Sequence, residues 1–413
     1  MPLASLLAAL CAESMGLAQE LLKAGLRSRF HRIRTNLALP VRTGRRLCLA
    51  VLPGLANMGS AASEPALQDV FRGEFLVGAA LNEAQFTAQD PARVRIITKH
   101  FNTITSENVL KWESVHPRPG QYDFAASDRY VAFGEKHRMF IVGHTLIWHS
   151  QSPDWIFQDD QGRPLDRVGL LNRMREHIQK VVGRYKGRIG GWDVVNEALN
   201  EDGSLRDSPW KKIIGDDYIQ QAFLFAHAAD PAAELYYNDY SLENAPKREG
   251  AAALVQKLQA AGVRITGIGT QQHLKLDWPT VAQVDDTLTR FAQLGVKVMV
   301  TELDVDVLPR ANRETGADVG QRVAADPALN PYPDGLPEIM QQKLARRYGE
   351  LFAVYRKHRG TLTRVTFWGV TDGDSWLNHW PVEGRTSYPL LFDRAGQPTP
   401  AFHAVTATPK MGP

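Results

Sequence analysis

The chain has 413 residues, enough for one large barrel or two ordinary domains, and its 44% hydrophobic and 23% charged residues are typical of a soluble globular protein. Residues 1–61 contain eight basic and two acidic residues, which leaves 40 basic and 43 acidic residues for the remainder. The net charge of +3 for the whole chain therefore becomes −3 after residue 61, and no nucleic-acid partner is indicated for that part.

An export signal is predicted near the N-terminus. Arg42, Arg45 and Arg46 precede an apolar run at 47–56, and small residues follow at 59–62. A basic, an apolar and a small-residue region in this order are typical of a signal peptide. The apolar run is shorter than the about 20 residues of a membrane span, so no membrane partner is expected. We therefore expect residues 1–61 to be a leader, with the signal at about 42–61, and the mature protein to be secreted or periplasmic.

The details of this leader stay open. The Arg45-Arg46 pair suggests a twin-arginine route, but the flanking residues match that signal poorly. The stretch before residue 42 fits either a start codon assigned too early or a short amphipathic helix.

Both cysteines, Cys11 and Cys48, lie in the predicted leader. Cleavage near Ala61 would leave no cysteine, which excludes a disulfide, a thiolate nucleophile and a cysteine-based metal site. Stability must then come from the hydrophobic core, which is feasible for a domain of this size.

From residue 66 onward, strand-like and helix-like segments alternate. Helical spacing of apolar residues predicts a helix at 170–185, and Gly262 predicts the end of a helix at 250–262. Strict alternation indicates a parallel sheet, and eight strand–helix units predict a closed (β/α)8 TIM barrel of the α/β class over 66–408. The eight predicted strands are residues 75–81, 103–108, 140–148, 191–198, 234–240, 267–273, 298–305 and 365–372.

No internal repeat and no linker rich in Pro, Gly or Ser marks a second domain. The irregular stretch 309–337 is long for a loop inside a compact domain. Loops of that length are usually functional or mobile.

Two predicted strands run apolar and then end in acidic residues. The first ends in Asn196 and Glu197, and the second contains Glu302 and Asp304. The C-terminal ends of barrel strands are where TIM-barrel enzymes carry their catalytic residues. One such Glu is more often a solvated edge residue or an ion-pair partner. Two in similar contexts, 105 residues apart, favour the paired carboxylates of a glycosidase.

The other predicted strands end in side chains that suit a sugar. Hydroxyl groups need hydrogen-bond donors and acceptors, and the C–H faces of a sugar ring need aromatic rings. Tryptophans are individually more often core residues, but Trp112 and three others gain weight from their rim positions. The candidates for substrate binding are Glu107, Asn108, Lys111, His144, Trp148, Gln151, Asn196, Asn238, Tyr240, Gln271, Trp368 and Trp376.

A mechanism follows from the strand ends. Residues two apart on a strand share a face, so Asp304 is expected beside Glu302. We assign Glu302 as the nucleophile, oriented by a neutral His273 that Asp304 holds. Glu197 would be the general acid and then the base, with a pKa raised by the charge of Glu302, and Asn196 would bond the 2-hydroxyl of the sugar. The carboxyl separation, about 5–5.5 Å for retention and about 6.5–9.5 Å for inversion, stays open at this point.

Metal and nucleotide chemistry have weaker support. His144 and His149 are five residues apart on a strand, hence on opposite faces, and no HExxH motif is present. Gly267 and Gly269 begin like a phosphate-binding loop, but the third glycine position holds Gln272. We expect no metal and no cofactor.

Six motifs along the chain carry a resemblance to a known family. They are SENVLKWE at 106–113, GHTLIWHSQSPDW at 143–155, WDVVNEAL at 192–199, GIGTQQH at 267–273, TELDV at 301–305 and WGVTDGDSW at 368–376. These motifs resemble glycoside hydrolase family 10, the retaining endo-β-1,4-xylanases, and the resemblance runs from about residue 75 to about residue 404. It implies a (β/α)8 barrel with the acid/base Glu197 on the fourth strand and the nucleophile Glu302 on the seventh.

The resemblance also implies roles for the other strand-end residues. The site of bond cleavage would be lined by Asn196, His144, Gln271 and His273. The next xylose toward the non-reducing end would be held by Glu107, Asn108 and Lys111. The cleft would be walled by Trp148, Trp368 and Trp376. A glucose C6 hydroxymethyl group would be crowded by Gln151 and Trp376.

The predicted function is that of a retaining endo-1,4-β-xylanase that cleaves internal bonds of xylan by double displacement. Its partners would be xylan and xylo-oligosaccharides, and a monomer is expected. The nearest alternative is a related retaining β-glycanase that acts on glucan or aryl glycosides. A sugar-binding barrel without activity is a further alternative, against which the presence of both glutamates speaks.

Overall fold

The computed structural model describes residues 64–310 and 319–410, which belong to one compact unit, Ser63–Pro413. The predicted leader, its export signal and both cysteines lie outside the described residues. None of the described helices is long and apolar enough to cross a membrane.

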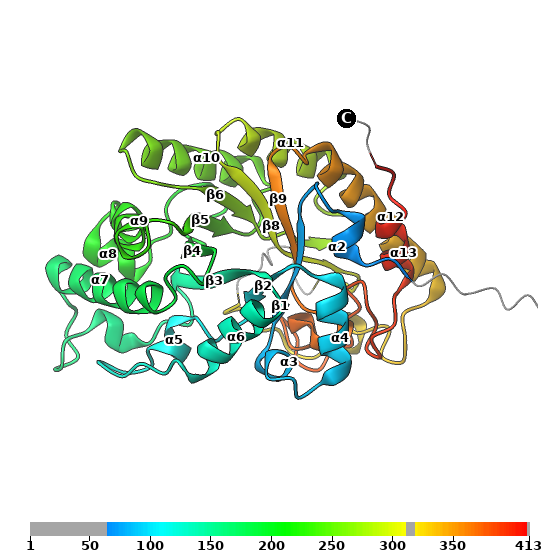
Figure 1. The fold of residues 1–413 in the computed structure, drawn as a ribbon, viewed down its shortest axis with the longest axis horizontal. Helices are drawn as coiled ribbons and strands as arrows, with labels where there is room; N and C mark the ends of the chain where they lie inside the picture. The colour runs from blue at the N-terminus through cyan, green and yellow to red at the C-terminus, as the bar shows by residue number, and fades with distance from the viewer. Residues whose placement is uncertain (1–63, 311–318, 411–413) are drawn as a thin grey trace, which may run out of the picture. The chain divides into compact units, whose positions relative to one another are not determined.

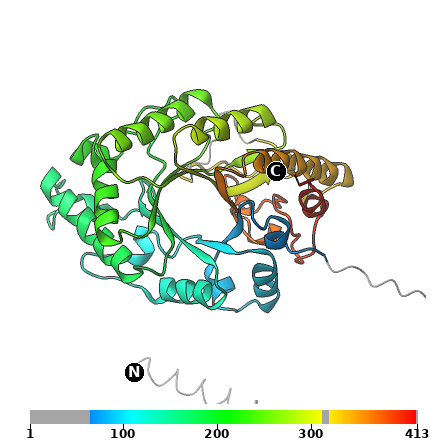
Figure 2. The same cartoon turned by 45° about the horizontal axis from the view of Figure 1, so that its top comes forward.

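Parallel strands close into a barrel in the order β6-β5-β4-β3-β2-β1-β9-β8, and pairing of β6 with β8 completes the ring. Figure 1 and Figure 2 show the helices arranged around this ring. The predicted (β/α)8 barrel is confirmed. The barrel strands are β1 (Leu76–Leu81), β2 (Thr103–Ser106), β3 (Phe140–Ile147), β4 (Gly191–Asn196), β5 (Glu234–Asp239), β6 (Gly267–Thr270), β8 (Lys297–Asp306) and β9 (Leu362–Phe367).

The predicted strands match the barrel strands, with two differences. The predicted strand 267–273 is divided: β6 ends at Thr270, and a separate strand β7 (His273–Lys275) pairs with the C-terminal end of β8. Between them, Gln272 has a φ of +60°, which interrupts the extended backbone. The strand predicted at 365–372 is shifted, because β9 ends at Phe367 and a 3-10 helix covers Asp372–Asp374.

The helices follow the strands along the chain. Besides three further 3-10 helices, η1 (Asp154–Phe157), η2 (Pro327–Leu329) and η4 (Trp376–Asn378), the described residues form α2 (Leu67–Val70), α3 (Glu83–Phe86), α4 (Pro91–His100), α5 (Trp112–Val115), α6 (Ala125–Lys136), α7 (Arg167–Arg184), α8 (Pro209–Ile214), α9 (Tyr218–Ala229), α10 (Ala245–Ala260), α11 (Val281–Ala292), α12 (Glu338–Lys357) and α13 (Pro400–Thr406).

Helix α7 illustrates why these segments are helical. The side chain of Asp166 caps its N-terminus by accepting a hydrogen bond from the Gly169 N–H. The buried residues Leu170, Met174 and Ile178 recur every four positions and form one apolar face. The predicted helix 170–185 therefore forms nearly where expected, and its apolar face is covered by the core.

The parallel arrangement gathers the polar strand ends at one rim. Every strand pair is parallel, so the C-terminal ends of all strands lie at the same end of the barrel. The long stretch predicted at 309–337 begins after β8 at this end. In its described parts, 309–310 and 319–337, the only regular element is η2, and residues 311–318 lie outside the described residues.

Between β3 and β4, a tryptophan ring leaves no room for a side chain at the position of its partner glycine. Gly143 on β3 pairs with Trp192 on β4, and the Trp192 indole is fully buried. A Cβ atom at position 143 would lie 2.1 Å from the indole Cε3 atom, which is far inside van der Waals contact. Glycine is therefore needed at this position to make room for the ring.

We expect Gly143→Ala to lower the free energy of unfolding by about 1–3 kcal/mol, because overpacking forces the indole or the backbone to move. Urea denaturation measures the change. Gly183→Ala on α7 is the matched control: no atom lies within 4 Å of the position that the new methyl group would occupy, and alanine favours the helix by up to about 1 kcal/mol. Equal effects of the two substitutions would contradict this explanation.

Candidate active site

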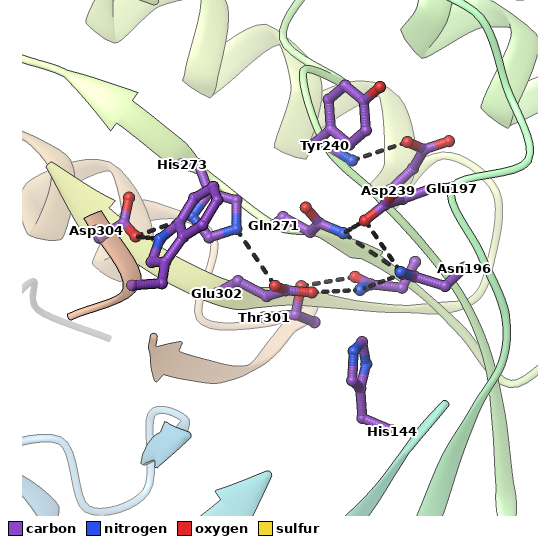
Figure 3. Close-up of polar contacts among 12 residues, drawn as sticks. His144, Asn196, Glu197, Asp239, Tyr240, Gln271, His273, Thr301, Glu302 and Asp304 are labelled. Atoms are coloured by element: carbon purple, nitrogen blue, oxygen red, sulfur yellow. Dashed lines mark hydrogen bonds and ion pairs between the residues drawn. The ribbon is translucent and has the colours of Figure 1, made fainter. Parts of the chain in front are cut away.

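Glu197 and Glu302 lie at the same rim of the barrel, as Figure 3 shows. Glu197 directly follows β4, and Glu302 lies in the C-terminal half of β8. Asn196 Nδ2 donates to Glu197 Oε1 over 3.0 Å, and Asn238 Nδ2 donates to Glu302 Oε1 over 2.8 Å. Asn238 Nδ2 also donates to Asn196 Oδ1 over 3.0 Å. One chain of hydrogen bonds thus links two carboxyl groups that are distant in the sequence.

Glu302 is buried, with 5% of its surface exposed, and is nevertheless held as a carboxylate. Burial alone would raise its pKa, but His273, His144 and Asn238 together lower the pKa of Glu302 below its ordinary value. His273 Nε2 lies 3.3 Å from Glu302 Oε2. A buried carboxylate that stays ionised in this way is suited to act as a nucleophile.

His273 lies between two carboxylates. Its Nδ1 is 2.9 Å from Asp304 Oδ2, which also accepts a hydrogen bond of 2.8 Å from Trp376 Nε1. Burial opposes a charge on the ring, but Asp304 and Glu302 outweigh it and raise the pKa of His273 to about 10. The prediction of a neutral His273 is therefore wrong, because a cation is favoured between these two acidic groups.

Glu197 has the opposite protonation preference. It is 4% exposed and accepts hydrogen bonds from Gln271 Nε2 over 2.9 Å and from Trp148 Nε1 over 2.8 Å. Burial raises the pKa of Glu197 to about 7, and the charges of Asp239 and Glu302 add to the shift. The charge of Glu302 was the expected cause of this raised pKa. Burial has the largest effect, and the charge of Asp239 raises the pKa more than the charge of Glu302 does. A carboxyl group with this pKa can both donate and accept a proton near neutral pH.

Two residues predicted to bind a ligand are occupied by contacts within the protein. Tyr240 accepts a hydrogen bond from Arg206 Nη2 over 2.9 Å, and Lys247 Nζ lies 3.6 Å from its ring centroid. Asn238 is 0% exposed. The amide of Asn238 is occupied on both sides, by Asn196, Glu302 and Thr301. This position fits a role in holding the carboxyl groups rather than contact with a ligand.

A second polar cluster lies along the rim. Lys111 Nζ donates to Asn108 Oδ1 over 2.9 Å and to Gln151 Oε1 over 2.7 Å. Burial lowers the pKa of Lys111, and the charge of Glu107 opposes this shift. Gln151 donates in turn to Glu113, which the sequence reasoning did not name. The fold therefore brings the predicted residues Glu107, Asn108, Lys111 and Gln151 together.

Aromatic rings border these polar groups. The ring centroid of Trp368 is 5.5 Å from that of His144, and the centroid of Trp376 is 4.8 Å from that of His273. Trp376 also stacks on Trp380 at 4.4 Å, a residue that was not predicted. These rings supply apolar surface next to the carboxyl groups, as a sugar ring requires.

Trp112 does not belong to this border, and its predicted rim position is wrong. Its indole is 2% exposed and stacks on His177 at a centroid distance of 3.6 Å. Trp112 is the first residue of helix α5 and belongs to the hydrophobic core.

Sequence reasoning missed two acidic residues of the site. Asp193 Oδ2 lies 2.9 Å from His144 Nδ1, and the charge of Asp239 raises the pKa of Glu197. The position of Asp193 inside an otherwise apolar strand was a usable signal, since a buried charge needs a partner. Asp239 carried no comparable signal, because it simply follows Asn238 at a strand end.

The alternatives of a metal site and a phosphate loop gain no support. Among the described residues, no group of three or more His, Cys, Asp or Glu side chains is placed to hold a metal ion. Gly267 and Gly269 lie within β6 rather than in a loop. A Cβ atom at Gly269 would lie 2.5 Å from Asn238 Oδ1, so this glycine makes room for the amide that holds Glu302.

Several known proteins are similar to this chain over most of its length. Residues 66–408 match the family model of glycosyl hydrolase family 10. The chain is 47% identical to endo-1,4-beta-xylanase A of Xylanibacter ruminicola, over 81% of this chain and 90% of that protein. It is 40% identical to an endo-1,4-beta-xylanase of Geobacillus stearothermophilus, over 83% and 98%. The structure of a GH10 endoxylanase from a sugarcane soil metagenome is similar with a TM-score of 0.81 at 44% identity, over 83% of this chain and 99% of that one.

We expect the charged His273 to make stability depend on pH. The folded-state pKa of about 10 lies above the ordinary value of 6.5, so the folded protein binds the extra proton between these values. The contribution of His273 is therefore complete below pH 6.5 and is lost as the pH rises toward 10. The difference in unfolding free energy between the wild type and His273→Gln should shrink over this range, as urea titrations at several pH values would show. A difference that does not change with pH would mean that the folded-state ring is neutral.

Proposed function

The chain belongs to glycosyl hydrolase family 10, and on this premise we propose that Glu302 and Glu197 are the nucleophile and the acid/base of the reaction. The activity is that of a retaining endo-1,4-β-xylanase, and relatives that match over most of both chains are named endo-1,4-beta-xylanases. The observation that carries the residue roles is the opposite shift of two buried, linked carboxyl groups: the pKa of Glu302 is lowered and that of Glu197 is raised to about 7.

In the first step, the ionised Glu302 attacks the anomeric carbon of a xylose unit. The glycosidic C–O bond breaks, and Glu197 gives its proton to the departing oxygen. A glycosyl ester of Glu302 remains, and the leaving chain departs as an alcohol. His273 and Asn238, both bonded to Glu302, hold the nucleophile in place.

In the second step, the ionised Glu197 takes a proton from water, and the oxygen of that water attacks the same anomeric carbon. The ester bond breaks and Glu302 leaves as a carboxylate. The ester carries no charge, so the repulsion that Glu302 exerts on the Glu197 charge is absent during this step and the base form is easier to reach. Two inversions give net retention of configuration.

The remaining rim residues are assigned to sugar binding. The buried cluster around Lys111 offers charged donors and acceptors for hydroxyl groups on one side of the cleavage site. The indoles offer apolar surface. Xylose lacks the C6 hydroxymethyl group of glucose, and Gln151 and Trp376 would disfavour that group. The binding residues are Glu107, Asn108, Lys111, His144, Trp148, Gln151, Asn196, Gln271, Trp368 and Trp376.

The location and assembly of the enzyme are also proposals. The basic, apolar and small-residue order at 42–61 supports export to the periplasm or the medium. An extracellular polymer as substrate supports the same location. We assign a monomer, because one chain supplies both carboxyl groups and the surrounding binding residues. The two-carboxylate reaction needs no metal and no cofactor.

Proton NMR of fresh product from xylotetraose tests substrate class and stereochemistry together. We expect the β-anomer to appear first, because the reaction proceeds through two inversions. We also expect kcat/KM to be higher on xylo-oligosaccharides than on cello-oligosaccharides of equal length. A preference for the cello-series would favour the related β-glycanase, and initial α-anomer would contradict the covalent role of Glu302.

Replacing the acid should affect substrates according to their leaving group. We expect Glu197→Ala to lower kcat/KM on xylotetraose by about 10²–10⁴-fold, but far less on a dinitrophenyl xylobioside, whose leaving group needs no proton. Glu302→Ala should abolish hydrolysis of both substrates, since each needs the nucleophile. Equal losses on both substrates in Glu197→Ala would show that its role is misassigned.

A further inference from the structure

The backbone that carries Glu197 has an unusual conformation. β4 ends at Asn196, and the next residue, Glu197, has a φ of +57°. This left-handed conformation is unfavourable for a residue with a side chain, and it persists only where surrounding contacts hold it. The direction of the Glu197 carboxyl group therefore depends on what holds the turn at residues 197–199.

The three N–H groups of this turn donate hydrogen bonds to residues of β5. Glu197 N donates to the carbonyl oxygen of Asn238 over 2.9 Å. Ala198 N donates to the Tyr237 hydroxyl over 3.2 Å, and Leu199 N donates to Asp239 Oδ2 over 3.3 Å. The Tyr237 hydroxyl also donates to Asp239 Oδ2 over 2.5 Å, so both contacts depend on the Asp239 carboxylate.

The three carbonyl groups of the turn are all bonded by a single residue, Arg206. Its Nε donates to Glu197 O over 3.2 Å, its backbone N to Ala198 O over 2.7 Å, and its Nη2 to Leu199 O over 3.4 Å. The same Nη2 donates to the Tyr240 hydroxyl over 2.9 Å. The rigid fork of a guanidinium group can reach several acceptors at once, which a lysine ammonium on a flexible stem does less well.

The carboxyl group of Asp239, which bonds the N–H side of the turn, is paired with the buried Lys247. Asp239 and Lys247 are both 0% exposed, and Lys247 Nζ lies 3.1 Å from Asp239 Oδ1. Lys247 Nζ also lies 3.6 Å from the Tyr240 ring centroid and 3.0 Å from Glu201 Oε1. Burial raises the pKa of Asp239 and Lys247 opposes this shift, so the ion pair holds the carboxyl group of Asp239 beside the turn.

We propose that Arg206, opposed by Asp239 across the turn 197–199, is a positioning residue that directs the Glu197 carboxyl group at the bond to be cleaved. This inference rests on the proposed acid/base role of Glu197. Arg206 bonds the backbone of the turn and the Tyr240 hydroxyl but neither carboxyl group, so it acts through the backbone that carries Glu197. A misplacement of a reacting group by about 1 Å can cost about 10²-fold in rate, so loss of the guanidinium contacts should impair proton transfer specifically.

The test compares Arg206→Lys and Arg206→Met on two substrates. Both variants keep the backbone N–H to Ala198 and lose the forked contacts to Glu197 O and Leu199 O. We expect kcat/KM on xylotetraose to fall by about 10–100-fold, and kcat/KM on a dinitrophenyl xylobioside to change by less than about threefold, because that leaving group needs no proton. Arg206→Lys, which keeps the charge, covers the case in which Arg206→Met does not fold.

Arg356→Met is the matched control. Arg356 is 1% exposed and also donates to backbone carbonyls, those of Thr408 and Val70, but it packs on Phe71 before the first barrel strand. We expect it to lower the melting temperature while leaving the ratio of the two kcat/KM values unchanged. A merely structural role of Arg206 would give the same pattern as this control.

Two outcomes would overturn the proposal, and Glu197→Ala measured in parallel separates them. If Glu197→Ala distinguishes the two substrates but neither Arg206 variant does, Arg206 does not position the acid/base. If Glu197→Ala itself lowers both kcat/KM values equally, the acid/base assignment fails, and the positioning role fails with it.

Discussion

The hydrogen bonds through Asn196 and Asn238 are the contacts on which the site depends. They join Glu197, after β4, to Glu302, on β8, by way of an amide on β5. Such a chain exists only if the strands between them are in the observed register. A shift by one residue would turn each of these side chains to the opposite face. Closure of the barrel therefore also brings the reacting groups together. The buried amides at the rim form the hydrogen bonds that connect these groups.

Burial raises the pKa of both glutamates, so their other neighbours must distinguish them. Glu302 lies beside a charged His273, whose pKa is about 10, and both His273 and Asn238 lower the pKa of Glu302. Glu197 receives neutral donors, Trp148 and Gln271, and faces the charge of Asp239. In an interior of low dielectric constant, such differences between neighbours act strongly. The division of labour between nucleophile and proton donor is thus set by the partners of each glutamate and not by the glutamates themselves.

The turn at Glu197 adds a second requirement, that of direction. A residue with a φ of +57° is held by contacts from both sides: Arg206 bonds the carbonyl groups of the turn, and residues of β5 bond its N–H groups. Strained backbone of this kind is concentrated at functional sites, where the surrounding structure stabilises it. The stability of the turn and the orientation of the Glu197 carboxyl group consequently depend on the same hydrogen bonds.

The barrel and the acidic ends of two of its strands could be predicted without coordinates, because strand–helix alternation and apolar runs that end in acids are local patterns. Period-two spacing also predicted Asp304 beside Glu302. Four properties required the folded protein: the charge of His273, the cause of the raised Glu197 pKa, the internal place of Asn238 and the burial of Trp112. Those properties depend on which side chains, remote in the chain, meet in the interior: Asp304 and Glu302 at His273, Asp239 at Glu197, and His177 at Trp112. Electrostatic and packing energies depend on distance in space, which no local pattern of residues records.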